Sequence, residues 1–201
     1  MIGIEEYKEL REKYWDVASW TIWAPAGERP KSNIGDLSVF NDPDLLKKIN
    51  TGFVFVALNG SGVHDAYLES SKPWFNFHSD YSRGHDYKMR YAMKGTPLWG
   101  SYITDIIKYY QEVDSSKAVK YAKSHPEVMK QNIEAFKDEL RLLGGNPVII
   151  ALGDATYNIL KENFNSEYHI IKIKHYSFTI GKEDYRKELL EAVEPFITFV
   201  K

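Results

Sequence analysis

Short apolar runs that end in small and polar residues predict the strands of this chain. Residues 53–58 form one such run, which passes directly into the Asn-Gly-Ser-Gly segment 59–62. Residues 148–152 are apolar throughout, which is typical of a strand covered on both faces. The runs 102–107 and 169–174 mix apolar residues with Thr, Asp or Lys. We therefore expect four parallel strands, with the first and third central and the second and fourth at the edges.

Helical patterns alternate with these runs. Apolar residues at helical spacing predict helices over 3–15 and 45–49, and a capping box opens a helix at Ser124 that Gly144 and Gly145 end. Asp154 is placed to cap the helix after the third strand, and a last helix is expected near 183–197. The Trp-rich stretch 15–36 has no clear period, and 61–94 reads as a long loop-rich insertion.

This alternation predicts a single domain over residues 1–201 of the α/β class. Its expected architecture is a three-layer α/β/α sandwich with a short parallel four-stranded sheet in the order 2-1-3-4. In such folds, ligands bind outside the carboxyl ends of the strands. Asn59, Asp105 and His175 lie at or just after predicted strand ends, so that edge of the sheet is where a site is expected.

Composition narrows the classes of function. The chain has no cysteine, which excludes disulfides, thiolate nucleophiles and cysteine-held iron–sulfur clusters. The formal net charge is −2, so DNA could be bound only through a local basic patch. The charged, amphipathic N-terminus lacks the apolar stretch of a signal peptide, and no run reaches membrane-spanning length. We therefore expect a cytoplasmic protein without a membrane partner.

Four segments resemble the uracil-DNA glycosylase superfamily, in the same order. Residues 57–62, Ala-Leu-Asn-Gly-Ser-Gly, are similar to its first motif, commonly Gly-Leu-Asn-Pro-Gly. Residues 102–108 resemble the strand Tyr-Ile-Thr-Asn-hydrophobic-hydrophobic-Lys of its thermostable branches. Residues 147–155 resemble its third strand, and 175–177, His-Tyr-Ser, fall where the family has His-Pro-Ser. The resemblance spans about residues 50 to 180 and implies the same fold.

The resemblance implies hydrolysis of the N-glycosidic bond of a flipped base in DNA, without a cofactor or metal. Asn59 would hold the attacking water, and His175 would donate to the base carbonyl as charge develops there. The base or substrate would be contacted by Leu58, Gly60, Phe77, Asp105 and Ser177, with Phe77 stacking on the ring. The backbone phosphates would be held by Ser61, Gly62 and Lys174.

The sequence departs from the family pattern at several positions. Gly60 and Tyr176 replace prolines, and Thr179 stands where the family often has an apolar wedge, for which Phe178 is one substitute. Asp105 replaces an asparagine that reads the uracil edge with one donor and one acceptor. Because an ionised aspartate offers only acceptors, we expect a preference for bases with two neighbouring donors, such as xanthine-like or guanine-like bases, over uracil.

Other interpretations of the same residues stay open. Asn59 with Gly60 also fits a plain turn, His175 a structural histidine, and Asp105 a turn cap or a partner of Lys108. Lys174 also fits the solvated side of an edge strand. A second function is therefore a non-catalytic protein that binds a small nucleobase ligand, a nucleotide or nucleic acid. A third is a small-molecule hydrolase whose metal would be held in the His- and Asp-rich segment by His78, Asp80 and His85.

Overall fold

Five strands form one mixed sheet in the computed structural model, which describes residues 2–60, 72–81, 83–164 and 166–199. The sheet order is β1-β3-β2-β4-β5, and β3, β2, β4 and β5 run parallel to one another. The strands are β1 (Ala18–Trp20), β2 (Asn50–Asn59), β3 (Ser101–Ile107), β4 (Val148–Leu152) and β5 (Ile170–Ile173). The α/β class predicted from the sequence is confirmed.

The expectation of a four-stranded, purely parallel sheet is wrong, because a fifth strand, β1, changes the strand count and the full order; the four predicted strands keep their expected relative order, β3-β2-β4-β5. β1 pairs antiparallel with β3, with Ser19 opposite Ile103, so that β3 lies inside the sheet and not at its edge. Every residue of β3 is buried, including Thr104, whose hydroxyl donates to Glu139, and Asp105, whose Oδ2 accepts from Asn76. The mixed composition of this strand therefore reflects internal hydrogen bonding and not exposure to solvent.

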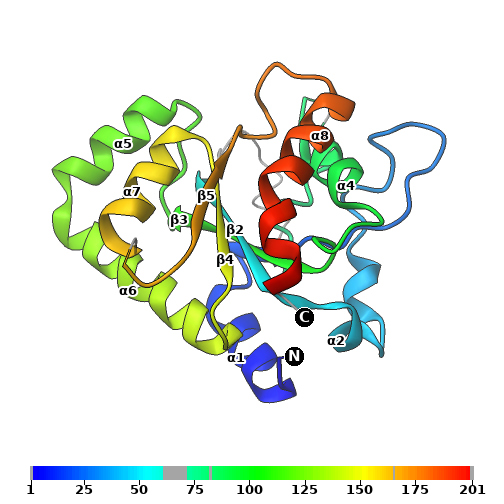
Figure 1. The fold of residues 1–201 in the computed structure, drawn as a ribbon, viewed down its shortest axis with the longest axis horizontal. Helices are drawn as coiled ribbons and strands as arrows, with labels where there is room; N and C mark the ends of the chain where they lie inside the picture. The colour runs from blue at the N-terminus through cyan, green and yellow to red at the C-terminus, as the bar shows by residue number, and fades with distance from the viewer. Residues whose placement is uncertain (1, 61–71, 82, 165, 200–201) are drawn as a thin grey trace.

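Helices cover both faces of the sheet (Figure 1). One face packs against α1 (Ile4–Tyr14), α5 (Ser115–Ser124), α6 (Pro126–Leu143) and α7 (Asp154–Phe164). The other face packs against α4 (Asp86–Met93) and α8 (Lys182–Val193). Shorter helical turns are η1 (Leu37–Asn41), α2 (Leu45–Lys48) and η2 (Glu194–Phe199). The expected loop-rich segment therefore ends in a helix, α4, in which Met89 and Met93 are buried together with the charged Asp86, Lys88 and Arg90.

Alternation along β2 sends its side chains into two separate cores. Val54 and Val56 belong to the cluster on the α6 face, whereas Phe53 and Phe55 belong to the cluster on the α4–α8 face. Both phenylalanines are completely buried, and burial of one such side chain stabilises a fold by about 1.5–3 kcal/mol. The same alternation directs Asn59 toward the α4–α8 face at the end of the strand.

Several helix boundaries agree with the sequence pattern. α1 and α2 lie within the predicted ranges, and α6 ends at Gly144, whose φ of 71° is readily adopted only by glycine. The predicted capping box is wrong, because the N-cap of α6 is His125, which makes no side-chain cap bond, and Ser124 Oγ bonds the Tyr121 carbonyl instead. Within the described residues, no helix is both long and apolar enough to cross a membrane.

Candidate functional site

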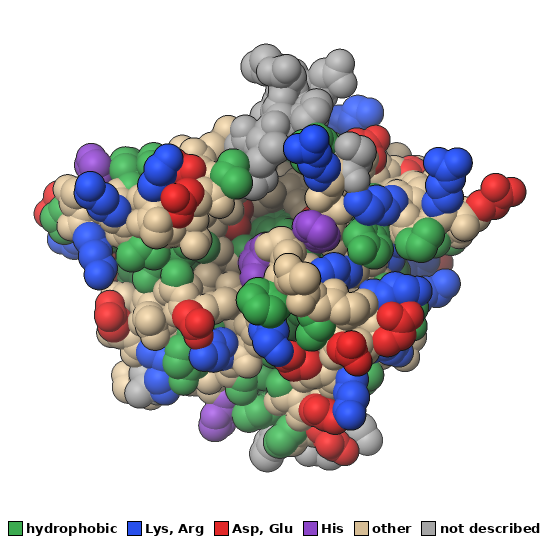
Figure 2. All heavy atoms as spheres, turned by 90° about the horizontal axis from the view of Figure 1, so that it is seen from above, with side chains coloured by type: hydrophobic (Ala, Val, Ile, Leu, Met, Phe, Trp, Pro, Cys, Tyr) green, Lys and Arg blue, Asp and Glu red, His purple; other side chains and the backbone are tan. Residues whose placement is uncertain are grey.

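The predicted site residues come to the edge of the sheet where the parallel strands end, here called the carboxyl edge. Asn59 closes β2, and Asp105 pairs with Ala57 across β2 and β3. His175 follows β5 by two residues. Figure 2 looks onto this edge and shows a central hollow, with histidine side chains beside it and lysine and arginine side chains interspersed with acidic ones around it.

The side-chain amide of Asn59 ties the end of β2 to the loop after β3. Its Nδ2 donates to the carbonyl oxygens of Gly60 at 2.9 Å, Tyr110 at 3.2 Å and Glu112 at 2.8 Å. These contacts use the donors of the amide, so what Asn59 can offer a ligand or a water molecule is its carbonyl oxygen, an acceptor. That oxygen can orient a water molecule by accepting a hydrogen bond from one of its O–H groups.

Asp105 is a buried carboxyl with one committed oxygen. Its Oδ2 accepts a 2.9 Å hydrogen bond from Asn76 Nδ2, which also donates to the Val17 carbonyl. Its Oδ1 is buried and has no hydrogen-bond partner among the described residues. Burial raises the pKa of Asp105 to about 7, against the opposing effects of Asn76 and the Lys108 ammonium. Near neutral pH, this side chain therefore exists in both the protonated and the ionised form.

A second buried carboxyl lies nearby and is joined to the site through Tyr176. The Tyr176 hydroxyl is hydrogen-bonded to Asp86, whose Oδ2 also accepts from the Ser79 backbone N–H at 2.9 Å. Burial raises the pKa of Asp86 to about 6. Burial and the negative charges of Asp86 and Asp105 raise the pKa of Tyr176, so its hydroxyl stays protonated. Tyr176 thus lies close to both carboxyls and directly beside His175.

His175 is held as a neutral imidazole with a defined tautomer. The Ser177 backbone N–H donates to its Nδ1 at 3.2 Å, and Ser177 Oγ lies 2.8 Å from the same atom. A backbone N–H can only donate, so Nδ1 is an acceptor and the ring proton lies on Nε2. Burial, with the charges of His85 and Lys88, lowers the pKa of His175 to about 4. At neutral pH, Nε2–H is therefore an uncharged donor.

The loop that carries His175 is anchored from α4 and exposes a phenylalanine. Lys88 Nζ donates to the Phe178 carbonyl at 2.8 Å, and the Phe178 N–H donates to the His175 carbonyl at 2.9 Å. Lys88 is only 5% exposed, whereas the Phe178 side chain is 55% exposed. A large apolar side chain left in solvent on a pinned loop is available for contact with a partner molecule.

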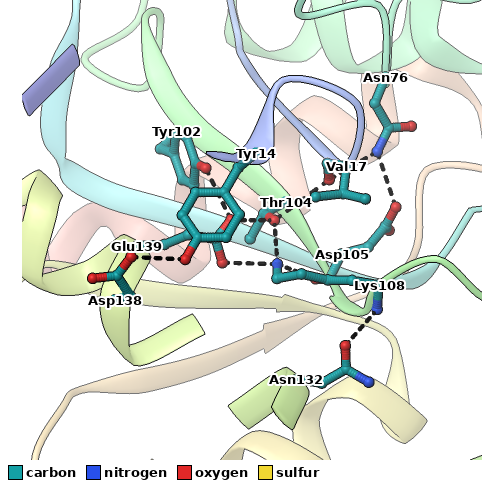
Figure 3. A network of polar contacts seen from close by, with 10 residues as sticks. All are labelled: Tyr14, Val17, Asn76, Tyr102, Thr104, Asp105, Lys108, Asn132, Asp138 and Glu139. Atoms are coloured by element: carbon teal, nitrogen blue, oxygen red, sulfur yellow. Dashed lines mark hydrogen bonds and ion pairs between the residues drawn. The ribbon is translucent and has the colours of Figure 1, made fainter. Parts of the chain in front are cut away.

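Beneath Asp105, a buried ion pair joins β3 to α6 (Figure 3). Lys108 Nζ lies 2.8 Å from Glu139 Oε2 and donates to Thr104 Oγ1 and to the Asp105 carbonyl. Glu139 Oε1 accepts from the Tyr102 hydroxyl at 2.9 Å and from Thr104 Oγ1 at 2.7 Å. Lys108 therefore pairs with Glu139 through its side chain and touches Asp105 only at the backbone.

The remaining predicted site residues are less directly placed to meet a ligand. Leu58 is buried in the α6-face core, and Phe77 is 7% exposed in the α4–α8 core at an unusual φ of 66°. Lys174 Nζ pairs with Glu188 at 2.6 Å. The carbonyl of Gly60 accepts from Asn59 and from the Glu112 N–H. The predicted phosphate ligands Ser61 and Gly62 lie outside the described residues.

The His- and Asp-rich segment does not form a metal centre in the part of the chain that the structure describes. No group of three or more His, Asp or Glu side chains there could hold an ion. His78 is completely buried, with its Nε2 2.8 Å from the Ile22 carbonyl and its Nδ1 3.2 Å from Ser19 Oγ. Its ring also stacks on Trp23 at 5.2 Å, so this histidine has a structural role.

Several residues around the site were not identified from the sequence. Asn76, Asp86 and Lys88 belong to the segment that was read as loop, and neither spacing nor a motif pointed to them. The sequence drew attention to Tyr176 only because it replaces a proline of the family pattern. In the structure, Trp74 and Phe77 of this segment have positive φ angles of 70° and 66°, a strain that is typical of functional segments but that the sequence does not reveal.

Comparison of the chain with protein-family models, with curated proteins and with solved structures found no match. The functional interpretation therefore rests on the geometry of the site and on the sequence resemblance.

Proposed function

We propose that this protein hydrolyses the N-glycosidic bond of a flipped, deaminated or mispaired base in DNA, as the resemblance to uracil-DNA glycosylases implies. The observation that carries the proposal is the state of His175, a neutral imidazole whose Nδ1 accepts from the Ser177 N–H, so that Nε2 carries the proton. An uncharged donor can stabilise the negative charge that develops on a departing base without first giving up its proton.

The other two residues supply what the reaction also needs. In hydrolysis, the C1′–N bond of the nucleotide breaks, water adds its hydroxyl to C1′, and the released proton neutralises the base. The carbonyl of Asn59 would orient that water, in keeping with an amide whose donors are already bound. Asp105 would contact the base edge through Oδ1, its buried and unpartnered oxygen. Phe178, 55% exposed, would fill the gap left in the duplex.

An excision assay tests the proposal. Duplex oligonucleotides carrying uracil, hypoxanthine, xanthine or a mismatch are incubated with the protein and then treated with alkali, which cleaves the strand at abasic sites. We expect strand breaks that fall by about 10²–10³-fold in His175→Ala, the loss typical when one stabilising donor is removed. Asn59→Ala should lose activity as well.

Matched variants separate these losses from general damage to the fold. His125→Ala at the N-cap of α6 and Asn163→Ala on α7 remove the same side-chain types at exposed positions and should leave excision unchanged. Strand breaks that persist at wild-type rates in both His175→Ala and Asn59→Ala would refute the assigned roles.

One observation favours a second candidate function, the binding of a free nucleobase or nucleotide without catalysis. Basic side chains near the carboxyl edge are paired with acids: Lys172 with Asp154 and Lys174 with Glu188. Paired lysines attract a DNA backbone less than unpaired ones. Saturable binding of free xanthine or uracil, lost in Asp105→Ala, together with no strand breaks on any oligonucleotide, would favour this function over excision.

A further inference from the structure

A cavity of about 420 Å³ lies on the outer side of α4, away from the carboxyl-edge site. Its walls come from residues 23–30, from the outward face of α4, from Trp99 and from the start of α8. In Figure 1 the loop that follows β1 lies beyond α4, on the side opposite the sheet. The volume lies within the range of about 300–1,000 Å³ that is usual for small-molecule sites.

Aromatic rings form much of the lining, from Trp23, Trp99, Tyr87 and Tyr91. The rings of Trp23 and Trp99 meet edge to face at 5.9 Å, and the Tyr91 side chain is partly open to solvent at 37% exposure. Walls of this kind suit a flat ring, which can stack on them, or a cation, which is attracted to their faces.

Charge decides between these two ligand classes. The lining contains three cationic side chains, Arg90, Lys94 and Lys182, and the carboxylate of Glu28; Lys182 Nζ also lies 3.2 Å from Glu183 Oε1. Lys182 Nζ already lies over the Tyr91 ring, 4.3 Å from its centroid, so the cation–π position there is filled from within the protein. A cationic ligand would be repelled, whereas an anionic group would be attracted to the exposed side chain of Lys94.

The walls are fixed in place before any ligand binds. The buried guanidinium of Arg90 donates to the carbonyls of Ala24 at 2.9 Å and Pro30 at 2.6 Å, which fastens the 23–30 segment to α4. Arg186 of α8 donates to the carbonyls of Tyr91, Ala92 and Lys94 at the C-terminal end of α4. A preformed pocket loses little conformational entropy when a ligand enters.

We infer that the outer cavity binds a flat aromatic ring that bears an anionic group, as a nucleotide does. The ring would pack against the aromatic walls of the cavity, and the anion would lie near the exposed Lys94. The same chemistry is offered by a free mononucleotide and by a base with its phosphate in a single-stranded nucleic acid. This site is separate from the proposed hydrolytic site and does not depend on it.

Titration followed by NMR tests the inference through the indole N–H signals of Trp23 and Trp99, two of the five tryptophans. Uridine 5′-monophosphate should shift both signals saturably, uridine should bind more weakly, and an oligothymidylate that binds more tightly than the mononucleotide would identify nucleic acid as the source. Lys94→Glu should weaken mononucleotide binding by about tenfold or more, since a charge-assisted contact is worth about 1.4 kcal/mol or more.

Tyr91→Ala should weaken binding independently of charge, because it removes one wall. Lys123→Glu, the same charge change on exposed α5, should have no effect. The inference is overturned if no probe shifts the two signals, if uridine binds as tightly as its monophosphate, or if Lys94→Glu and Tyr91→Ala both bind like the wild type.

Discussion

Asp105 is the residue whose chemistry bears most on what the carboxyl-edge site recognises. When ionised, it offers only acceptors to a base edge; when protonated, it offers one donor and one acceptor, as an asparagine does. With a pKa of about 7, both forms exist near neutral pH. The preference against uracil expected from the sequence should therefore hold above that pH and weaken below it.

Replacement of Asp105 by asparagine should alter how stability depends on pH. The raised pKa means that, between about pH 4 and 7, the folded protein holds a proton that the unfolded chain has released, so the wild type loses stability as pH rises through this window. Asp105→Asn cannot ionise, and its free energy of unfolding should exceed that of the wild type at pH 8 by on the order of 2–4 kcal/mol. The difference should vanish near pH 4.

Urea unfolding at a series of pH values measures this difference. Asp44→Asn, the same change at an exposed position, should follow the wild-type curve. A stability difference between Asp105→Asn and the wild type that does not change from pH 5 to pH 8 would contradict the assigned pKa. In the excision assay, the same variant should shift preference toward uracil.

Lys88 offers a test of why His175 is neutral. Burial is the largest cause of the lowered pKa of His175, and the charges of His85 and Lys88 lower it further. Lys88→Met keeps most of the buried stem but removes the charge, so the pKa of His175 should rise from about 4 but stay below the usual value near 6.5, because the ring remains buried. An NMR titration of the His175 ring measures this pKa directly. Lys187→Met on exposed α8 should leave the titration unchanged, and an unchanged pKa in Lys88→Met would contradict the assignment.

At the scale of elements, the site depends on how β3 is fixed to α6. The buried ion pair of Lys108 with Glu139 and its hydrogen bonds to Thr104 and Tyr102 hold the strand beneath Asp105 (Figure 3). A buried pair of this kind is weak evidence of net stabilisation, but removal of one partner is costly because the other charge stays buried alone.

Glu139→Gln tests this network. It leaves the Lys108 ammonium without its counter-charge and should lower the free energy of unfolding by about 3–5 kcal/mol. It should also lower the pKa of Asp105, because the negative charge of Glu139 raises that pKa. Glu134→Gln on the exposed side of α6 should cost less than about 1 kcal/mol. A Glu139→Gln protein as stable as Glu134→Gln would show that the pair does not hold β3.

Sequence patterns identified the elements that carry a strong apolar run of their own. β2 and β4 were found because residues 53–58 and 148–152 are buried on both faces and apolar at every position. β1 was missed because only three residues pair, and its partner β3 lies far along the chain. α4 was missed because several of its buried residues are polar or charged, such as Asp86, Lys88 and Arg90.

The same limit applies to the site. Asn59, Asp105 and His175 were predictable because parallel strands deliver their carboxyl ends to one edge. Asn76 and Asp86 were not, because the path of their segment is set by contacts between distant aromatic residues, such as Trp74 with Trp20 and Tyr7. Contacts between residues so far apart in the sequence produce no pattern in the local spacing of residues.

At the scale of the whole molecule, the protein has one recess at the carboxyl edge and another outside α4. Only the first is proposed to hold a base for hydrolysis. A crystal structure with a duplex that carries a 2′-fluoro xanthine nucleotide distinguishes the two recesses by the position of the base. The fluorine disfavours positive charge on the sugar and so slows cleavage of the nucleotide. We expect the base to be extruded, with its edge at Asp105 and a carbonyl oxygen about 2.7–3.2 Å from His175 Nε2. A base that stays stacked in the duplex, or that enters the outer cavity instead, would contradict the proposed function.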